Sequence, residues 1–159
     1  MKIILCMPVI GEGGNMKVIV SHSDLADAVL TVSTVIPTRS TQPILANVLL
    51  TADNSKLTIV GTDKERSLFV SIPAEVPIPG SFGVPAKRLS DVLRQIQDGE
   101  LELTVEDFKL NIKYGGTLVK LPGVSPEDFP QTELLKNPQK TFQLETKLLS
   151  ELMELTTYS

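Results

Sequence analysis

A cluster of basic side chains is the feature of this sequence best placed to do chemistry. Lys87, Asp91 and Arg94 are spaced at i, i+4 and i+7, so on a helix they share one stripe. Arg88 stands next to the first of them. Cations gathered in this way attract phosphate groups. The same spacing also suits a solvated face with an internal salt bridge, and spacing alone favours that plainer interpretation.

Two other polar groups have structural explanations. His22 is the only histidine, so metal or Ser-His chemistry would have to rest on this one imidazole beside Asp24. We expect it instead to be a polar residue at the start of a helix. Asp63 and Glu65 are the kind of residues that hold magnesium, but they fall in residues 61–66, where Gly, Thr and Asp are ordinary turn formers. We expect a strand-to-strand turn there.

Motifs for catalysis are missing from the sequence. It contains no glycine-rich phosphate loop, no Gly-x-Ser-x-Gly elbow and no paired carboxylates placed for acid–base work. The only cysteine, Cys6, excludes an intramolecular disulfide and a cysteine-based zinc site, which fits a reducing cytosol. The sequence therefore predicts a protein that is not an enzyme and needs no cofactor or metal.

The composition is that of an acidic globular chain. Its 159 residues, 42% of them apolar, suit one full domain with a sizeable core plus a remnant. A net charge of −4 argues against coating of nucleic acid through bulk positive charge, so any contact with a polyanion must come from a local face. Residues 1–10 are apolar, but Pro8 interrupts them and no signal-peptidase site follows. We expect a cytoplasmic protein.

One structural pattern begins three times along the chain. A strand at residues 17–21 precedes a helix at about 23–35, with Ser23 or Ser21 as its cap. Residues 82–84 then lead into a second helix at 86–97, and a third strand and helix open near residue 142. A spacing of roughly 60 residues between the copies indicates internal repetition.

Strand-like runs follow each of the first two helices. They cover residues 43–51, 56–61 and 66–72 after the first helix, and residues 100–105, 108–113 and 117–121 after the second. Prolines between residues 73 and 79 mark a link, because proline cannot continue a central ladder. Two β-α-β-β-β units predict an α+β domain with both helices on one face of antiparallel sheets.

The same pattern sets the expected domain boundaries. Residues 1–15 are predicted to be a poorly ordered, dispensable extension before a natural start at Met16. Residues 16–135 form the first domain. Residues 136–159 hold a linker and the truncated start of a second domain, whose helix lacks the strands that should cover its apolar face. The sequence is therefore typical of a fragment of a longer repeat protein.

Four motifs together resemble the bacterial β sliding clamp family, the processivity subunit of DNA polymerase III. In order and spacing the matching segments are residues 42–50, 61–63, 84–93 and 121–130, and the resemblance extends over about residues 16–159. It implies the clamp fold, in which each subunit has three domains of two β-α-β-β-β units. Two such subunits close head to tail into a ring around duplex DNA, with no catalytic role of their own.

The resemblance also implies partners and contact residues. Arg39 matches an arginine that touches DNA in this family, and Lys87 matches a basic position at the start of the second helix. With their neighbours Arg88 and Arg94 they are the predicted DNA-binding residues. A ring holds DNA by topology, so its contacts can be loose and water-mediated. Lysine at position 87 keeps the attraction to phosphate but lacks the bidentate fork of arginine.

Other functions stay open at this point. In the family, DNA polymerase and clamp loader bind through later domains, and the second subunit of the homodimer contributes a third domain to the interface, so this chain alone should not close a ring. One alternative is a truncated clamp-like module that binds or inhibits intact clamp subunits rather than DNA. Another is an acidic binding domain whose basic stripe is merely solvated.

Overall fold

The computed structural model describes residues 15–37 and 42–130, all within one compact unit. Arg39, the predicted extension up to residue 14 and the predicted second-domain segment at 136–159 lie outside the described residues. The boundaries proposed for those segments therefore stay predictions.

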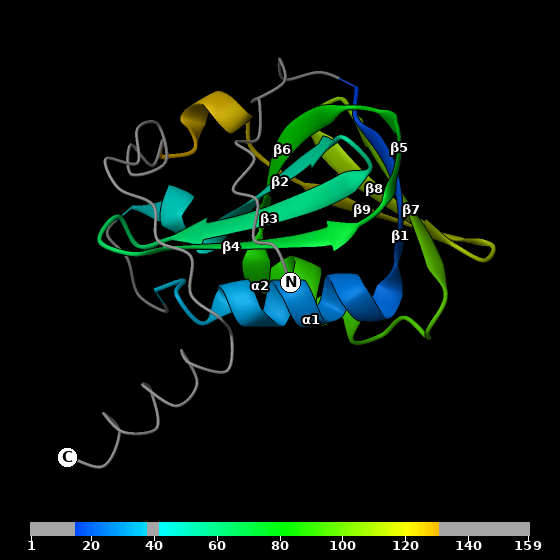
Figure 1. The fold of residues 1–159 in the computed structure, drawn as a ribbon, viewed down its shortest axis with the longest axis horizontal. Helices are drawn as coiled ribbons and strands as arrows, with labels where there is room; N and C mark the ends of the chain where they lie inside the picture. The colour runs from blue at the N-terminus through cyan, green and yellow to red at the C-terminus, as the bar shows by residue number, and fades with distance from the viewer. Residues whose placement is uncertain (1–14, 38–41, 131–159) are drawn as a thin grey trace, which may run out of the picture. The chain divides into compact units, whose positions relative to one another are not determined.

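The described chain contains the two predicted units in the predicted order (Figure 1). The first unit consists of β1 (Lys17–Ser21), α1 (His22–Ser33), β2 (Asn47–Asp53), β3 (Lys56–Thr62) and β4 (Ser67–Pro73). The second consists of β6 (Gly80–Pro85), α2 (Ala86–Leu93), β7 (Glu100–Glu106), β8 (Lys109–Tyr114) and β9 (Thr117–Pro122). Between them lies β5 (Glu75–Ile78), and two 3₁₀ turns are η1 (Pro43–Ala46) and η2 (Pro126–Asp128).

The strands form two antiparallel sheets that exchange strands between the units. The five-stranded sheet has the order β5-β1-β7-β8-β9, and the four-stranded sheet has the order β4-β3-β2-β6. Thus β1 of the first unit pairs with β7 of the second, and β6 of the second pairs with β2 of the first. Each unit supplies its opening strand to the other unit's sheet, so neither sheet is complete without both units.

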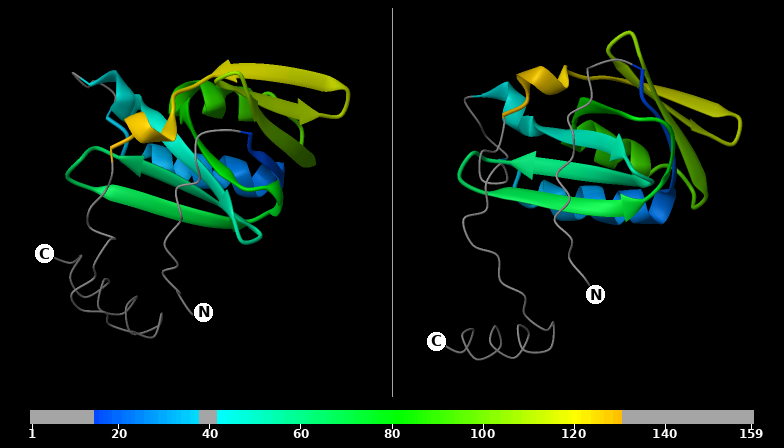
Figure 2. Two further views of the ribbon diagram at one scale, coloured as in Figure 1. Left: turned by 90° about the horizontal axis from the view of Figure 1, so that it is seen from above. Right: turned by 45° about the horizontal axis from the view of Figure 1, so that its top comes forward.

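Both helices lie on the same side of the sheets and contact each other (Figures 1 and 2). Their apolar residues recur at helical spacing and point into a single core shared with the inner faces of both sheets. The fully buried members include Leu25, Val32, Leu50, Ile59, Leu89, Leu93, Leu103 and Ile112. The predicted α+β class, with helices on one face of antiparallel sheets, is confirmed.

The prediction of a strand over residues 43–51 was wrong at its beginning. Pro43 stands at the first position of η1, where its fixed φ suits a helical turn. The buried side chain of Asn47 donates from Nδ2 to the carbonyl of Ile44 over 3.0 Å, which holds that turn in place. The strand therefore begins only at Asn47.

Three smaller boundaries also differ from the prediction. The first helix starts at His22, with Ser21 at the N-cap position; Ser21 Oγ contacts Ser23 Oγ over 2.9 Å and caps no backbone amide. The second α-helix ends at Leu93 and continues only as turns. Part of the predicted link is β5, whose single proline, Pro77, is tolerated because β5 is an edge strand.

Candidate nucleic-acid interface

The exposed face of α2 gathers three of the four predicted DNA-binding residues. Ala86, Leu89 and Leu93 are buried and fix the orientation of the helix on the core. Lys87, Arg88 and Arg94 are exposed, as is Asp91 between them. The first and last of these cations lie along one stripe, as their spacing predicts, and Arg88 widens it. The fourth predicted residue, Arg39, lies outside the described part of the chain.

These cations form no ion pair within the described part of the chain. Among residues 15–37 and 42–130, ion pairs join Lys17 to Glu102, His22 to Asp98 and Arg66 to Asp63. None of them involves the three α2 cations or Asp91, although i, i+3 and i, i+4 spacing allows a pair. The internal salt bridge of the plainer interpretation is therefore not formed, and the cations are available to an external anion.

The position of two of these cations is unfavourable for the helix itself. Lys87 and Arg88 lie in the first turn of α2, which contains no acidic residue, and Pro85 at the N-cap offers no capping side chain. Positive charge near a helix N-terminus opposes the helix dipole and costs about 0.3–1 kcal/mol. Helix stability therefore does not explain why two cations occupy this turn, whereas attraction to an anion would.

The neighbouring helix α1 presents the opposite charge. Its exposed face carries Asp24 and Asp27 together with Leu30, which is 57% exposed, and residues 22–33 contain no lysine or arginine. Asp24 lies in the first turn, where it complements the helix dipole. The side of the domain formed by the two helices is therefore basic on α2 and acidic on α1.

His22 fixes the start of α1 against the end of α2. Its Nε2–H donates to the carbonyl oxygen of Leu93 over 2.8 Å, and Nδ1 lies 2.9 Å from Oδ1 of Asp98. With Nε2 donating, Nδ1 meets a carboxylate favourably only when it also carries a proton. The hydrogen bond to Leu93 and the Asp98 carboxylate therefore raise the pKa of His22, against the opposing effect of burial. The sequence placed His22 at the helix start but gave no signal for a partner 76 residues away.

The Asp63 cluster is a turn, as predicted. Its Oδ1 accepts hydrogen bonds from the backbone amides of Glu65 and Arg66, and its Oδ2 accepts from the Arg66 guanidinium over 3.0 Å. These hydrogen bonds, the one from the Arg66 amide above all, lower the pKa of Asp63. Because both carboxylate oxygens serve the turn, the arrangement favours a structural role over cation binding.

Comparison with known proteins identifies the family. Residues 16–133 match the model for the DNA polymerase III beta subunit, N-terminal domain. The beta sliding clamp of Synechococcus elongatus is 30% identical over 139 residues, which is 86% of this chain and 37% of that protein. The beta sliding clamp of Pseudomonas putida is 34% identical over 131 residues, covering 80% of this chain and 35% of that protein.

Solved structures show the same fold. The crystal structure of the beta sliding clamp of C. crescentus has a TM-score of 0.72 and 31% sequence identity, covering 76% of this chain and 32% of the clamp chain. The two-unit α+β fold is therefore that of a sliding-clamp domain, and the chain belongs to the DNA polymerase III beta subunit family. It spans about a third of the length of these relatives. In the described residues, no helix has the length and apolar character that a membrane span requires.

Proposed function

We propose that this chain acts as the DNA-facing first domain of a sliding clamp, a non-catalytic processivity factor for DNA polymerase. The observation that carries the proposal is the face of α2, where Lys87, Arg88 and Arg94 are exposed and form no ion pair with Asp91. Lys87 and Arg88 also lie in the first turn of the helix, where positive charge opposes the helix dipole. The family membership supplies the context, since the relatives are named beta sliding clamps.

A ring explains how an acidic protein can work on DNA. The chain carries a net charge of −4, so free binding to a polyanion is weak. Enclosure removes the need for tight binding, and a few lysine and arginine contacts to phosphates, many through water, suffice to centre the duplex while allowing it to move. Phosphate contacts carry no sequence information, which suits a protein that must slide.

The charge difference between the two helices sets where those contacts fall. We place the duplex against α2 and against Arg39, which follows α1 in the sequence. The Asp24 and Asp27 face of α1 repels phosphate and limits the total attraction. The domain would thus hold DNA through one edge of its helical side, a loose arrangement that favours sliding over residence at one site.

The second subunit of the ring also needs a surface on this domain. β9 is one of the two edge strands of the five-stranded sheet, and the side chain of its Leu118 is 53% exposed. An outer strand presents unpaired backbone N–H and C=O groups that a strand of another chain can use. We propose β9 as part of the subunit contact of a homodimeric clamp, with DNA polymerase and clamp loader recruited through other domains of the ring.

The alternative of a module that inhibits intact clamps is not favoured by the comparisons, which match clamp domains along the whole described fold. Because bacterial chromosomal DNA lies in the cytoplasm, we expect the protein to act there.

The test uses a full-length clamp in which this chain forms the first domain. Replacing Arg39 and Lys87 by glutamate should shorten residence on a closed circular duplex and reduce the salt dependence by about one unit per lost phosphate contact. The matched single variants Lys87→Gln and Arg88→Gln remove charge from an unfavourable helix position, so the free energy of unfolding of each should equal that of the parent or exceed it by up to about 1 kcal/mol. An unchanged salt slope together with unchanged processivity would mean that the α2 face is merely solvated.

A further inference from the structure

The turn between β7 and β8 holds an aromatic side chain in an unusual conformation. Asp107 and Phe108 have φ angles of 49° and 57°, which puts both in the left-handed region. Hairpin turns of this kind favour Asn and Gly, and a bulky residue there is strained. Phe108 is also 71% exposed, so packing in the core does not compensate for that strain.

The surrounding backbone holds this turn in place. The amide of Gly123 donates to the carbonyl oxygen of Phe108 over 3.2 Å, which ties the turn to the segment leading to η2. Val124 of that segment forms a bridge with Gly83 in β6. The strained aromatic is therefore displayed on a fixed support, the arrangement expected when a side chain serves a contact with another molecule.

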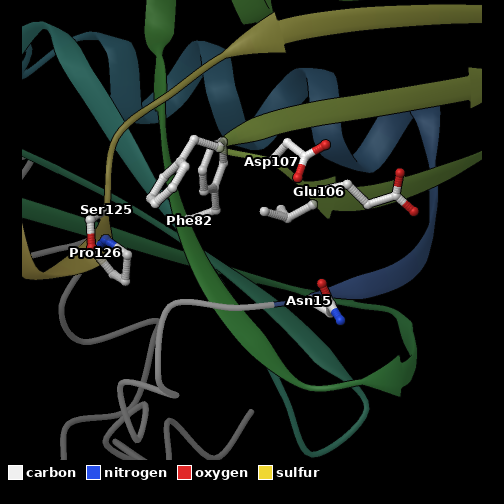
Figure 3. A pocket seen from close by; sticks show the side chains of 8 residues that line it. Asn15, Phe82, Glu106, Asp107, Ser125 and Pro126 are labelled. Carbon is white, nitrogen blue, oxygen red and sulfur yellow. The ribbon is translucent and has the colours of Figure 1, made fainter.

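Phe108 is one of the residues that line a hollow. Figure 3 shows other lining residues, among them Phe82, Asp107 and Pro126. Its apolar walls come from Phe82, Val105, Phe108 and Pro126, and its volume is about 200 Å³. Small-molecule sites usually measure roughly 300–1,000 Å³, so this hollow suits one or two apolar side chains of a partner rather than a whole ligand. It flanks η2, which lies on the far side of the sheets from the two helices (Figure 1), so it is separate from the proposed DNA face.

The charges around the hollow indicate the charge of a partner that would bind there. Glu106 and Asp107 are the charged residues that line it, and both are exposed carboxylates. The next acidic residues, Glu127 and Asp128, follow Pro126 directly in the chain, whereas the nearby cation Lys109 does not line the hollow. The rim is thus complementary to lysine or arginine, and the exposed ring of Phe108 offers a face to which a cation is also attracted.

We propose that this hollow is a docking site for a segment of a partner protein in which apolar side chains are followed directly by basic ones. The apolar side chains enter between Phe82, Phe108 and Pro126, and the basic side chains lie against Glu106 and Asp107. The site adds a protein contact to the domain beyond its proposed DNA contacts, and it does not depend on them.

The test is a titration of the ¹⁵N-labelled 159-residue chain with three synthetic hexapeptides, in which the amide resonances of the chain are monitored by NMR. The first contains Leu-Phe-Arg-Lys between glycines, the second Leu-Phe-Glu-Glu and the third Ala-Ala-Arg-Lys. We expect the first peptide to shift the amide resonances of Glu106, Phe108 and Ser125 and to bind at least ten-fold more tightly than either of the others. Equal binding of all three, or shifts confined to other parts of the chain, would contradict the proposal.

Variants separate binding from folding. Phe108→Asn places a residue that tolerates the left-handed region in the turn, so its thermal midpoint should equal or exceed that of the parent while peptide binding falls at least ten-fold. The double change Glu106→Gln and Asp107→Asn should abolish the preference for the basic peptide over the acidic one. Leu30→Ala is the matched control, because it removes an exposed apolar side chain from α1 and should leave binding unchanged.

Two outcomes would overturn the site. If Phe108→Asn lowers the thermal midpoint and leaves binding intact, Phe108 serves the fold and not a partner. If the amides around the hollow respond to dilution of the chain alone, a second copy of the chain occupies the hollow and the proposed partner is wrong.

Discussion

His22 joins α1 to the end of α2 through Nε2 of its ring, and to the segment that follows α2 through Nδ1. Nε2 donates to the Leu93 carbonyl at the end of α2, which also accepts from the Ile96 amide over 3.3 Å. Positive charge is favourable at this end of a helix. Nδ1 faces the carboxylate of Asp98. Protonation of the ring therefore strengthens these contacts.

The raised pKa of His22 predicts a pH dependence of stability. Because the folded-state value lies above the ordinary value of 6.5, the imidazolium stabilises the fold fully below pH 6.5, and this contribution is lost as the pH rises through the folded-state pKa. Urea unfolding of the chain and of His22→Ala between pH 5.5 and 8.5 should show a difference that shrinks with pH. At pH 5.5 the variant should be less stable by about 1–3 kcal/mol, since it removes the charge-assisted hydrogen bond from the ring to the Leu93 carbonyl.

Asp98 provides the control for this prediction. Asp98→Asn keeps an acceptor near the ring but removes the charge, so it should weaken the pH dependence without removing the bond to Leu93. A difference between the chain and His22→Ala that grew with pH would contradict the assigned protonation.

Gly61 sets how closely α1 approaches β3. A Cβ at this position would lie 2.5 Å from Cγ1 of Val32 and 3.2 Å from its carbonyl oxygen. Gly61→Ala should therefore destabilise the fold by about 1–3 kcal/mol through overpacking, measured by urea unfolding. Gly116→Ala is the matched control, because a Cβ there meets no atom within 4 Å. Equal stability of the two variants would show that α1 can move away from β3 without loss of stability.

At the level of helices and strands, patterns of apolar residues predicted most of the fold. Alternating runs such as residues 100–105 correspond to β7, and apolar residues spaced three and four apart predicted the buried faces of α1 and α2. The start of β2 was mispredicted because the apolar side chains of residues 43–46 look the same in a strand and in a 3₁₀ turn. Only the fixed φ of Pro43 and the side-chain hydrogen bonds of Asn47 distinguish the two.

The candidate site was predictable only in part, for a related reason. Helical spacing placed the α2 cations on one face, but spacing could not show whether Asp91 pairs with them, since that depends on side-chain conformations. The hollow beside Phe108 is lined by residues from β6, β7, η2 and the segment just before β1. These segments are far apart in the sequence, so no local sequence pattern predicts that they come together.

The opposed charges of the two helices yield a prediction for α1. Asp27 lies on its exposed face, so Asp27→Lys in a full-length clamp carrying this domain should lengthen residence on DNA and steepen the salt dependence by about one unit. Thr31→Lys lies one turn further along the same exposed face and leaves Asp27 in place. It shows whether an added cation alone lengthens residence on DNA as much as Asp27→Lys does. No change in either variant would place α1 away from the duplex.

The whole domain is tied together by the exchange of β1 and β6 between its sheets. Val18 of β1 is fully buried and pairs with Leu103 of β7, although the two belong to different units. A domain built in this way should unfold as one cooperative body, because neither unit keeps a complete sheet when the other opens.

Val18→Ala tests that cooperativity. We expect the free energy of unfolding to fall by roughly 1–3 kcal/mol, and the most protected amides of both sheets to lose the same free energy in hydrogen exchange. Ile19→Ala, on the opposite face of the strand, should cost less, since Ile19 is only partly buried. If β2, β3 and β4 kept their protection while β7, β8 and β9 lost theirs, the units would be independent.

The strand exchange also has a consequence for synthesis on the ribosome. β1 is complete once Ser21 has been translated, yet β7, with which it pairs, begins only at Glu100. In the same way β2 cannot pair with β6 until the chain has been translated beyond Gly80. Translation runs in one direction, so the nascent first unit spends much of its elongation with open strand edges and an uncovered apolar face. Final closure is therefore a late event, triggered by the second half of the polypeptide rather than completed in successive halves. Slow codons, or a chaperone bound before β7 emerges, would therefore act on a partly folded first unit. This intermediate is absent from the finished domain.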